Sequence, residues 1–498
     1  MHPSTLAKRV YLLLFIIVIA FYLYGLGQLP LLGPDEPRYA QIAREMLSNG
    51  DLITPTLGGH TWFEKPALLY WLIAGSFRLF GVSEWSARLG PAMCGVLTIL
   101  AVWCVAREVD RSFGFWSLIV TASCLGLIVF SRAASFDVVI TMTATWSLAF
   151  FLLHELPTTK RKRLLLAGFY SFVGLSLLAK GLVGIVIPFG VVGFYFLLRL
   201  FSRKGAKVQR ETESLPGAFL SAFAPLREKS SVLSSLFWGI PLALAVSAIW
   251  YGPVIARHGW IFIDEFFVQH HFARYVSNKY HHPQPIWFYP VIILMLALPW
   301  TVHLIAALAK VRSWNWRGED SVSVVRVFSL AWLLLPIVFF SFSGSKLPGY
   351  IVPAVPAVAL LVSDRLTTVR NSKWPLLIAG VTAASVLIVL HFAAAPYANR
   401  ESVRDLLALA DARGYANAPV LAQRSDDRSA EFYAHGRVIY GANGEPVTFD
   451  EVLVNQARAW GGRFVVFLPI EHAEKLRSAN GIEIIGNNGK TAVVGWKP

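Results

Sequence analysis

Apolar runs of about 17–25 residues recur along most of this 498-residue chain. An α-helix of that length, rising about 1.5 Å per residue, crosses the roughly 30 Å hydrocarbon core of a bilayer. The composition agrees, because 55% of the residues are hydrophobic and only 15% are charged, whereas soluble globular domains carry about 25% charged residues. The sequence therefore predicts a polytopic α-helical membrane protein.

Eleven segments are long and apolar enough to be predicted as spans. No A-x-A cleavage site follows the first of them, so we predict a retained span rather than a signal peptide. The spans are placed near residues 10–27, 86–106, 113–130, 137–154, 164–179, 182–200, 233–255, 286–309, 324–342, 347–363 and 374–395.

The run Pro66–Gly81 needs a separate interpretation, because it offers only about 15 apolar positions and contains Arg78. If it crossed the bilayer, every later loop would change sides. We predict that it lies at the outer surface, with its aromatic side chains among the lipid headgroups.

The positive charges favour one orientation. With the N-terminus in the cytoplasm, the inside segments hold 22 of the 45 Lys and Arg residues, including TTKRKR and RLFSRKGAK. Cytoplasmic loops attract Lys and Arg, so the net charge of +15 is a topology signal. We predict contact with membrane lipids and no nucleic-acid binding.

The odd number of spans places residues 396–498 outside. This tail has no long apolar run. We expect a helix in ESVRDLLALADARG, strands in APVLAQ, GRVIYG and GRFVVFLP, a capped helix in TFDEVLVNQARAW, and a hairpin in IEIIGNNGKTAVVGW with Asn488-Gly489 at its turn. The prediction is a membrane domain, 1–395, with outer-side helices at about 34–81, and a small periplasmic α/β domain, 396–498.

The three cysteines lie inside apolar runs. Their positions argue against a disulfide framework or a zinc cluster. The basic inside loops contain no Asp-x-Asp pair, which argues against a nucleotide-sugar site on that side. We therefore expect no nucleotide and no redox cofactor.

Ionisable residues gather on the predicted outer side, in five separate loops. Charges at bilayer depth cost a few kcal/mol each on insertion scales, so they need partners or a polar cavity. Both signs together favour a cavity that holds an anion and carries out chemistry beside it. The residues are Asp35, Glu36, Arg38, Arg44, Glu45, Glu64, Lys65, Arg132, Asp137, Lys180, Glu265, His270, His271, Arg274, Lys346 and Tyr350.

Structural explanations exist for several of these residues. Asp35 and Glu36 precede Pro37 and could cap a helix, PRYAQIAREML. Glu64-Lys65 could be a local ion pair. Arg132 and Lys180 could extend to the headgroups, and His270-His271 could be surface residues. The functional interpretation depends on their agreement on one face of the membrane.

The outer groups suit transfer from a lipid phosphate. Lys65, Arg274, Lys346 and Tyr350 supply donors for a phosphate from three loops. Arg38 and Tyr39, beside Asp35, complete the predicted phosphate-binding set.

Carboxylates supply the remaining chemistry. Asp35 is the predicted catalytic group that deprotonates or orients the acceptor, with Asp137 and Glu64 as further catalytic carboxylates. Glu64 and His271 also have ligand types suited to a divalent metal, zinc or magnesium, although two ligands do not define a site.

The motifs GPDEPRYAQIAREM, GDLITPTLGGHTWFEKPALLYW, FSRAASFD, LLAKG and SKLPGYIVP, in this order, resemble the membrane glycosyltransferases of the GT-C class. The likeness extends from about Val10 to Pro353. Within the class, the chain resembles the lipid A 4-amino-4-deoxy-L-arabinose transferase branch, which is related to protein O-mannosyltransferases.

The resemblance implies a transferase in the bacterial inner membrane that takes a sugar from an undecaprenyl (polyprenyl) phosphate carrier on the periplasmic side. It implies that Asp35 is the catalytic carboxylate, that Lys65 and Tyr350 face the donor phosphate, and that His271 takes part in a metal site. The acceptor stays open between lipid A, another glycolipid and a protein. Displacement of the phosphate from the opposite face predicts inversion at the anomeric carbon.

Two other functions use similar residues. A transporter or flippase for a lipid-linked sugar also needs basic groups and a groove, but it typically shows paired repeats and spans broken near the midplane. A scaffold or binding protein would place its working surface in residues 396–498. The crowding of charges at the outer edge of the spans favours the transferase.

Overall fold

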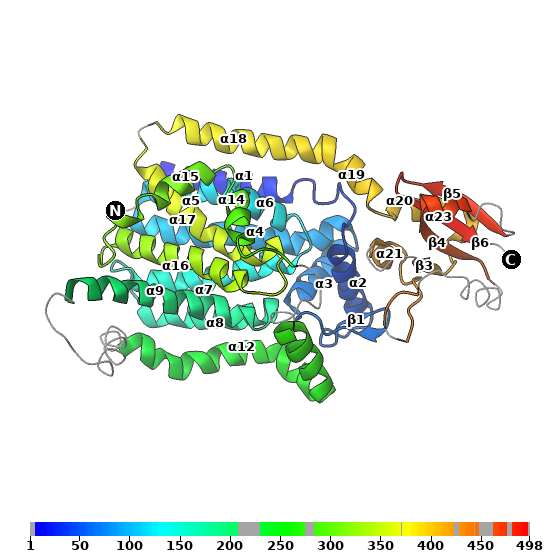
Figure 1. Ribbon diagram of the computed structural model, residues 1–498, viewed down its shortest axis with the longest axis horizontal. Coiled ribbons are helices and arrows are strands. Elements are labelled where there is room, and N and C mark those ends of the chain that lie inside the picture. The colour runs from blue at the N-terminus through cyan, green and yellow to red at the C-terminus, as the bar shows by residue number, and fades with distance from the viewer. Residues whose placement is uncertain are drawn as a thin grey trace.

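The computed structural model describes residues 5–207, 230–273, 283–369, 371–422, 428–442, 444–447, 462–475 and 481–496. Long helices form a bundle at one side of the molecule, and a small sheet with short helices lies at the other (Figure 1). Between them lies a layer of short elements from residues 35–80.

The bundle confirms a multi-pass membrane protein. Within the described residues, eight helices are long and apolar enough to span a bilayer, or up to ten if each bent pair counts as one span. α1 (Thr5–Leu23) is apolar but shorter, so the count of eleven stays a prediction. The eight are contained in α4 (Glu84–Val109), α7 (Phe136–Glu155), α8 (Lys162–Lys180), α9 (Val183–Lys207), α12 (Ser230–Ile263), α16 (Ser321–Ser341), α17 (Val355–Thr367) with the 3₁₀ segment η3 (Pro348–Ala354) before it, and α18 (Lys373–Ile388) with the segments after it.

Two predicted spans are broken helices. α5 (Arg111–Ser123) and α6 (Leu125–Ser131) meet at 55°. α14 (Phe288–Leu296) and α15 (Thr301–Leu308) meet at 119°, with Pro299 at the break. A proline cannot donate a backbone hydrogen bond and disfavours continuation of a helix, which explains the second break.

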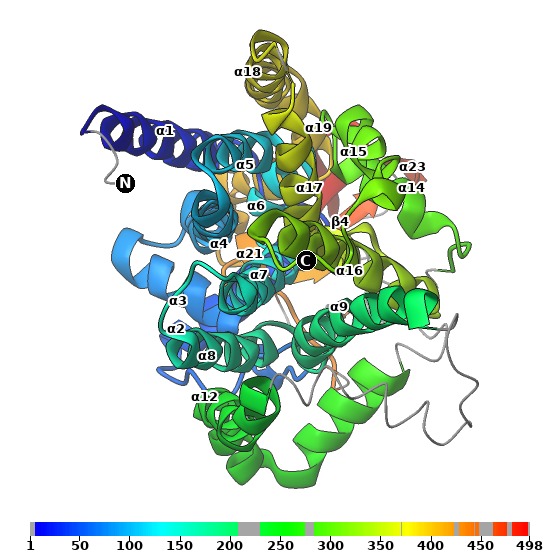
Figure 2. The same cartoon turned by 90° about the vertical axis from the view of Figure 1, so that its left-hand side faces the viewer.

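The helices pack unequally. α7 lies in the middle of the bundle in the end-on view (Figure 2), and 83% of its apolar window is buried. By contrast, only 6% of the apolar window in 373–400 is buried. That stretch comprises α18, η4 (Val389–Ala394) and α19 (Ala395–Arg400). Its exposed apolar side chains suit contact with lipid tails.

The layer beside the bundle positions the polar residues. α2 (Asp35–Ser48) packs on α3 (Leu68–Phe80), and a two-stranded ribbon of β1 (Thr56–Leu57) and β2 (His60–Thr61) lies between them in sequence. α3 has 13 residues, as the short run Pro66–Gly81 predicted. α12 kinks at Gly259 (φ 57°) and continues into the π-helical segment η1 (Asp264–Ala273).

The C-terminal segment contains a four-stranded sheet in the order β3-β4-β6-β5. β3 (Val420–Ala422) and β4 (Phe464–Pro469) pair in parallel. β5 (Ile482–Asn487) and β6 (Thr491–Trp496) form the predicted hairpin, with Gly489 at φ 89° in its turn. The short helices are α20 (Arg404–Ala410), η5 (Asp411–Tyr415), α21 (Ser429–Tyr433) and α23 (Ile470–Lys475).

Three expectations for this segment have different outcomes. GRVIYG is not a strand: only isolated bridges form, between Val438 and Val420 and between Tyr440 and Pro446. The helix predicted in TFDEVLVNQARAW lies outside the described residues. The helix predicted in ESVRDLLALADARG is present, and its backbone leaves helical geometry at Gly414 (φ 89°).

Candidate active site

A cavity of about 860 Å³ lies where the bundle, the α2 layer and the C-terminal segment meet. Groups of both signs line it, as the outer-loop charges predicted. The ionisable lining residues are Asp35, Arg38, Tyr39, His60, Glu64, Lys65, Asp137, Lys180, Glu265, His270, Tyr350, Arg428 and Glu445.

The first group of charges comes from α2 and the loop before α3. Arg38 Nη2 lies 2.7 Å from Asp35 Oδ1 and 3.4 Å from Glu64 Oε2. Lys65 Nζ lies 2.7 Å from Glu64 Oε1. Asp35 and Arg38 are one helical turn apart, which brings their side chains together. Glu64 and Lys65 are a local ion pair, as one interpretation held, and both also face the cavity.

Burial fixes the charge states of this group. The guanidinium of Arg38 lies over the Trp62 ring, 5.1 Å from its centroid. Burial acts to lower the pKa of Arg38, but Glu64 and Asp35 raise it above its usual value, so Arg38 stays charged. Burial raises the pKa of Tyr39 well above its usual value, so its phenol stays a hydrogen-bond donor.

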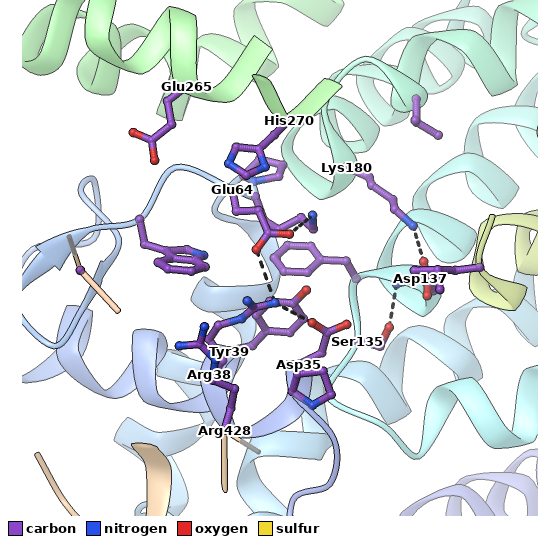
Figure 3. A pocket seen from close by; sticks show the side chains of 18 of the residues that line it. Asp35, Arg38, Tyr39, Glu64, Ser135, Asp137, Lys180, Glu265, His270 and Arg428 are labelled. Atoms are coloured by element: carbon purple, nitrogen blue, oxygen red, sulfur yellow. Dashed lines mark hydrogen bonds and ion pairs between the residues drawn. The ribbon is translucent and has the colours of Figure 1, made fainter. Parts of the chain in front are cut away.

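The second group comes from the N-terminus of α7, the C-terminus of α8 and η3. Ser135 Oγ accepts the Asp137 N–H at 3.1 Å and caps α7. Lys180 Nζ donates to Asp137 Oδ1 and lies 4.8 Å from the centre of the Tyr350 ring. A Cβ added at Gly349 would lie 1.8 Å from Asp137 Oδ2, so this approach requires glycine there. Figure 3 shows Asp137 and Lys180 to the right of Asp35, Arg38 and Glu64.

Glu36 and Arg88 hold the two groups in place, and the predicted helix cap is wrong. Pro34 is the N-cap of α2, with no side-chain hydrogen bond at that position. Instead, Arg88 in α4 donates through Nε and Nη2 to the two oxygens of Glu36, at 2.9 and 2.8 Å. Glu36 also accepts the N–H groups of Leu32 and Ala134, at 3.0 and 2.7 Å. The loop before Asp35 and the turn before Asp137 therefore share one buried carboxylate.

The remaining donors of Arg88 bind the same loop. Its Nη1 donates to the carbonyls of Leu26 and Leu29, and its Nη2 to that of Pro30, at 2.7–2.8 Å. Burial acts to raise the pKa of Glu36, but Arg88 and the N–H donors lower it below its usual value. The pair is therefore ionised and fully hydrogen-bonded.

Arg132 also has structural partners, which are backbone carbonyls of the protein itself. Its Nη1 and Nη2 donate to the carbonyls of Tyr24 and Phe21, each at 2.6 Å. These carbonyls lie at the C-terminus of α1, where backbone acceptors lack helical partners.

The structure brings together most of the predicted site residues. Lys346 is not among the lining residues; its ammonium donates to the Gln284 carbonyl at 2.9 Å. The side chain of His271 and all of Arg274 lie outside the described residues. The cavity is lined by Asp35, Arg38, Tyr39, Glu64, Lys65, Asp137 and Tyr350.

Six ionisable lining residues were not assigned a role from the sequence, namely His60, Lys180, Glu265, His270, Arg428 and Glu445. Glu265 and His270 come from η1 and are labelled in Figure 3, as is Arg428. Arg428 and Glu445 come from the C-terminal segment. The topology indicated the side of Glu265 and His270, but nothing local marks Arg428 and Glu445 as cavity residues, because they reach the site through tertiary packing.

The described residues do not form a metal site. No group of three His, Cys, Asp or Glu side chains that could hold an ion occurs among them. Glu64 already faces two cations, Lys65 and Arg38. The metal predicted at Glu64 and His271 therefore stays a prediction, and no step of the chemistry is derived through it.

The chain is similar to known membrane glycosyltransferases. The family model of dolichyl-phosphate-mannose-protein mannosyltransferases matches residues 8–223. Three relatives are named undecaprenyl phosphate-alpha-4-amino-4-deoxy-L-arabinose arabinosyl transferase. The Aeromonas salmonicida protein is 29% identical over 75% of this chain and 64% of its own length. The Edwardsiella ictaluri protein is 32% identical over 71% of this chain and 60% of its own length. The Pseudomonas aeruginosa (strain LESB58) protein is 33% identical over 70% of this chain and 57% of its own length. This chain therefore covers less than two thirds of the length of each of these three relatives.

Solved structures share the fold. ArnT from Cupriavidus metallidurans bound to undecaprenyl phosphate has a TM-score of 0.75 at 21% identity, over 97% of this chain and 98% of that one. An oligosaccharyltransferase from Archaeoglobus fulgidus has a TM-score of 0.51 at 14% identity, over 94% of this chain and 70% of that one.

The helical bundle and the charged cavity at its edge define a membrane protein with the GT-C fold. Within that class the chain resembles the aminoarabinose transferases and their mannosyltransferase relatives, which confirms the resemblance predicted from its motifs.

Proposed function

We propose that this chain is an integral membrane glycosyltransferase that moves a sugar from undecaprenyl phosphate to an envelope acceptor such as lipid A. The names of its relatives favour 4-amino-4-deoxy-L-arabinose as the sugar. The Lys and Arg distribution favours a cytoplasmic N-terminus, a periplasmic C-terminal α/β domain and a periplasmic cavity, in the bacterial inner membrane.

The observation that carries the proposal is the convergence of Asp35, Lys65, Asp137 and Tyr350 on one cavity, although they are far apart in the sequence. Lys65 and Tyr350 provide a cation and a phenol for the donor phosphate. Carboxylates lie beside these donors, within the same space. A lipid tail in the bilayer would bring the phosphate to this depth.

The reaction we propose is a displacement at the anomeric carbon. The acceptor oxygen attacks from the face opposite the phosphate, the carbon–oxygen bond to the phosphate breaks, and the configuration inverts. If the acceptor is a hydroxyl, Asp35 takes its proton. If the acceptor is already an anionic phosphate, Asp35 orients the reacting groups instead. Its contact with Arg38 at 2.7 Å fixes the carboxylate in either case.

Direct transfer tests the proposal. The purified full chain is mixed with undecaprenyl phosphate-4-amino-4-deoxy-L-arabinose and lipid A, and the lipid A is analysed by mass spectrometry. We expect the mass of one pentosamine to be added. The same analysis of glycolipids and envelope proteins from cells with and without the gene covers the other acceptors. Labelled donor that crosses the membrane without any transfer would favour a flippase instead.

Lys65 provides a test of donor binding. We expect Lys65→Met to raise the KM for the donor about tenfold or more, because a charge-assisted contact to the phosphate is lost. Lys490 is the control, since it pairs with Glu401 in the C-terminal segment and does not line the cavity. Lys490→Met should leave donor KM unchanged. An unchanged donor KM in Lys65→Met would place the phosphate elsewhere.

The metal prediction has its own test. If Glu64 and His271 hold zinc or magnesium, dialysis against EDTA lowers transfer, and one of the two ions restores it. Metal analysis of the dialysed and undialysed protein accompanies the rates. Full activity in metal-free protein would remove the metal from the reaction.

A further inference from the structure

Arg428 is the cation that the C-terminal segment contributes to the cavity. It directly precedes α21, and its relative exposure is only 6%. Two carboxylates hold its guanidinium: Nη1 lies 2.7 Å from Glu431 Oε1, and Nη2 lies 2.6 Å from Glu445 Oε2. Figure 3 shows Arg428 near Arg38, away from Lys180 and Asp137.

The two partners of Arg428 differ in burial. The side chain of Glu431 is 2% exposed and lies inside the protein, whereas that of Glu445 is 46% exposed and lines the cavity. Burial raises the pKa of Glu431, and the nearby guanidinium groups of Arg428 and Arg38 act against that rise. Separating Arg428 from Glu431 would leave a buried charge, whereas the carboxylate of Glu445 already contacts solvent and is the less costly partner to separate from Arg428.

The backbone around Glu445 is a tight turn. The Gly441 N–H donates to the Glu445 carbonyl at 2.9 Å, and the Gly444 N–H donates to the Gly441 carbonyl at 3.0 Å. Gly444 has φ 72°, which favours glycine, and the turn lies against His60. The turn holds the backbone of Glu445 at the edge of the cavity, from where its half-exposed side chain reaches Arg428.

The cavity has room for more than the donor headgroup. Its volume of about 860 Å³ is near the upper end of the roughly 300–1,000 Å³ range of ligand pockets. Lys65 and Lys180 come from the membrane part of the chain, whereas Arg428 comes from the C-terminal segment. The cavity thus offers a second cationic position, at which Nη1 is held by Glu431 and Nη2 faces the cavity-lining Glu445.

We propose that Arg428 binds a phosphate group of the acceptor, which replaces Glu445 on the guanidinium while Glu431 stays in place. This inference rests on the proposed function and adds to it a cation of the C-terminal segment that selects the acceptor. When no acceptor is bound, Glu445 pairs with the guanidinium of Arg428 and neutralises its charge. An anion must displace Glu445 to bind there, which selects against weakly bound anions.

Equilibrium binding tests the proposal without turnover. The full chain in nanodiscs is first saturated with undecaprenyl phosphate, and then titrated with fluorescent bisphosphorylated lipid A or with its dephosphorylated form. We expect wild-type protein to bind the phosphorylated form at least about tenfold more tightly. Arg428→Gln should abolish this preference. Arg428→Lys should reduce it, because one ammonium group replaces the two nitrogens that hold Glu431 and the phosphate separately.

Glu445→Gln gives the opposite prediction. Removing the competing carboxylate should tighten binding of phosphorylated lipid A several-fold, with no change for the dephosphorylated form. This variant keeps the proposal testable if Arg428→Gln does not fold, since Glu445 is half exposed. Arg437→Lys is the control, because Arg437 pairs with Asp411 at 2.9 Å and does not line the cavity.

A preference for phosphate that survives in Arg428→Lys and Glu445→Gln at its wild-type size would overturn the proposal. So would a wild-type protein that binds both forms equally. Failure of sugar transfer with the phosphate preference intact would count against the proposed function alone, because binding here is measured without a sugar donor.

Discussion

Asp35→Asn is expected to lower sugar transfer about 10²–10⁴-fold, the usual contribution of a positioned acid or base. Asparagine has nearly the same shape, but it carries no charge and takes up no proton at neutral pH. The rate of pentosamine transfer to lipid A, measured at saturating donor, is the readout. Binding of undecaprenyl phosphate should change little, because Lys65 and Tyr350 are untouched.

Asp405 offers a matched control for Asp35. Its side chain is 57% exposed and pairs with Arg404 at 3.0 Å, while that of Asp35 is 56% exposed and pairs with Arg38 at 2.7 Å. Asp405 does not line the cavity. Asp405→Asn should retain wild-type transfer. If Asp35→Asn also transfers at the wild-type rate, Asp35 has no part in the chemistry.

The fold was predictable where the physics is local or set by the bilayer. Run length and charge separated the spanning helices from Pro66–Gly81, which forms a 13-residue helix. Asn488-Gly489 marked a hairpin that the structure contains, because a turn with φ 89° requires glycine or a close substitute. Asp35 and Asp137 could be assigned to one cavity because charges at bilayer depth need a common polar space.

Long-range partners could not be predicted. Arg88 is 52 residues from Glu36 and looks like an ordinary cation at the start of a span. Arg132 could bind headgroups or helix carbonyls, and a single sequence does not distinguish them. Arg428 and Glu445 lie in a segment without a recognisable motif. The packing of α21 against α2 places Arg428 at the cavity, and the turn that carries Glu445 lies against His60.

The same packing ties the C-terminal segment to the loop before Asp35. The Tyr433 hydroxyl accepts the Leu31 N–H at 2.8 Å and donates to Glu84 at 3.0 Å. Arg44 in α2 donates to the Phe432 carbonyl at 2.9 Å. The segment therefore lines part of the cavity and supports the loop before Asp35.

Glu36→Gln is expected to reduce both stability and transfer. The substitution leaves the Arg88 guanidinium buried without its counter-charge, which typically costs about 3–5 kcal/mol. The loop before Asp35 and the turn before Asp137 then lose the anchor they share, and a displacement of about 1 Å is enough to slow a reaction about 10²-fold. Thermal unfolding and the transfer rate of the folded fraction, taken well below the unfolding midpoint, measure the two effects.

A double-mutant cycle separates the role in positioning from general stability. The transfer losses of Glu36→Gln and Arg88→Gln should not add in the double variant, since both remove one interaction. Arg326 and Asp364 form a similar fork, at 2.8 and 3.1 Å, between α16 and α17, outside the cavity lining. Asp364→Asn should therefore lower the unfolding temperature without slowing transfer by folded protein. If folded Glu36→Gln retains the wild-type rate, the pair stabilises the fold only, and the spacing of Asp35 and Asp137 has another origin.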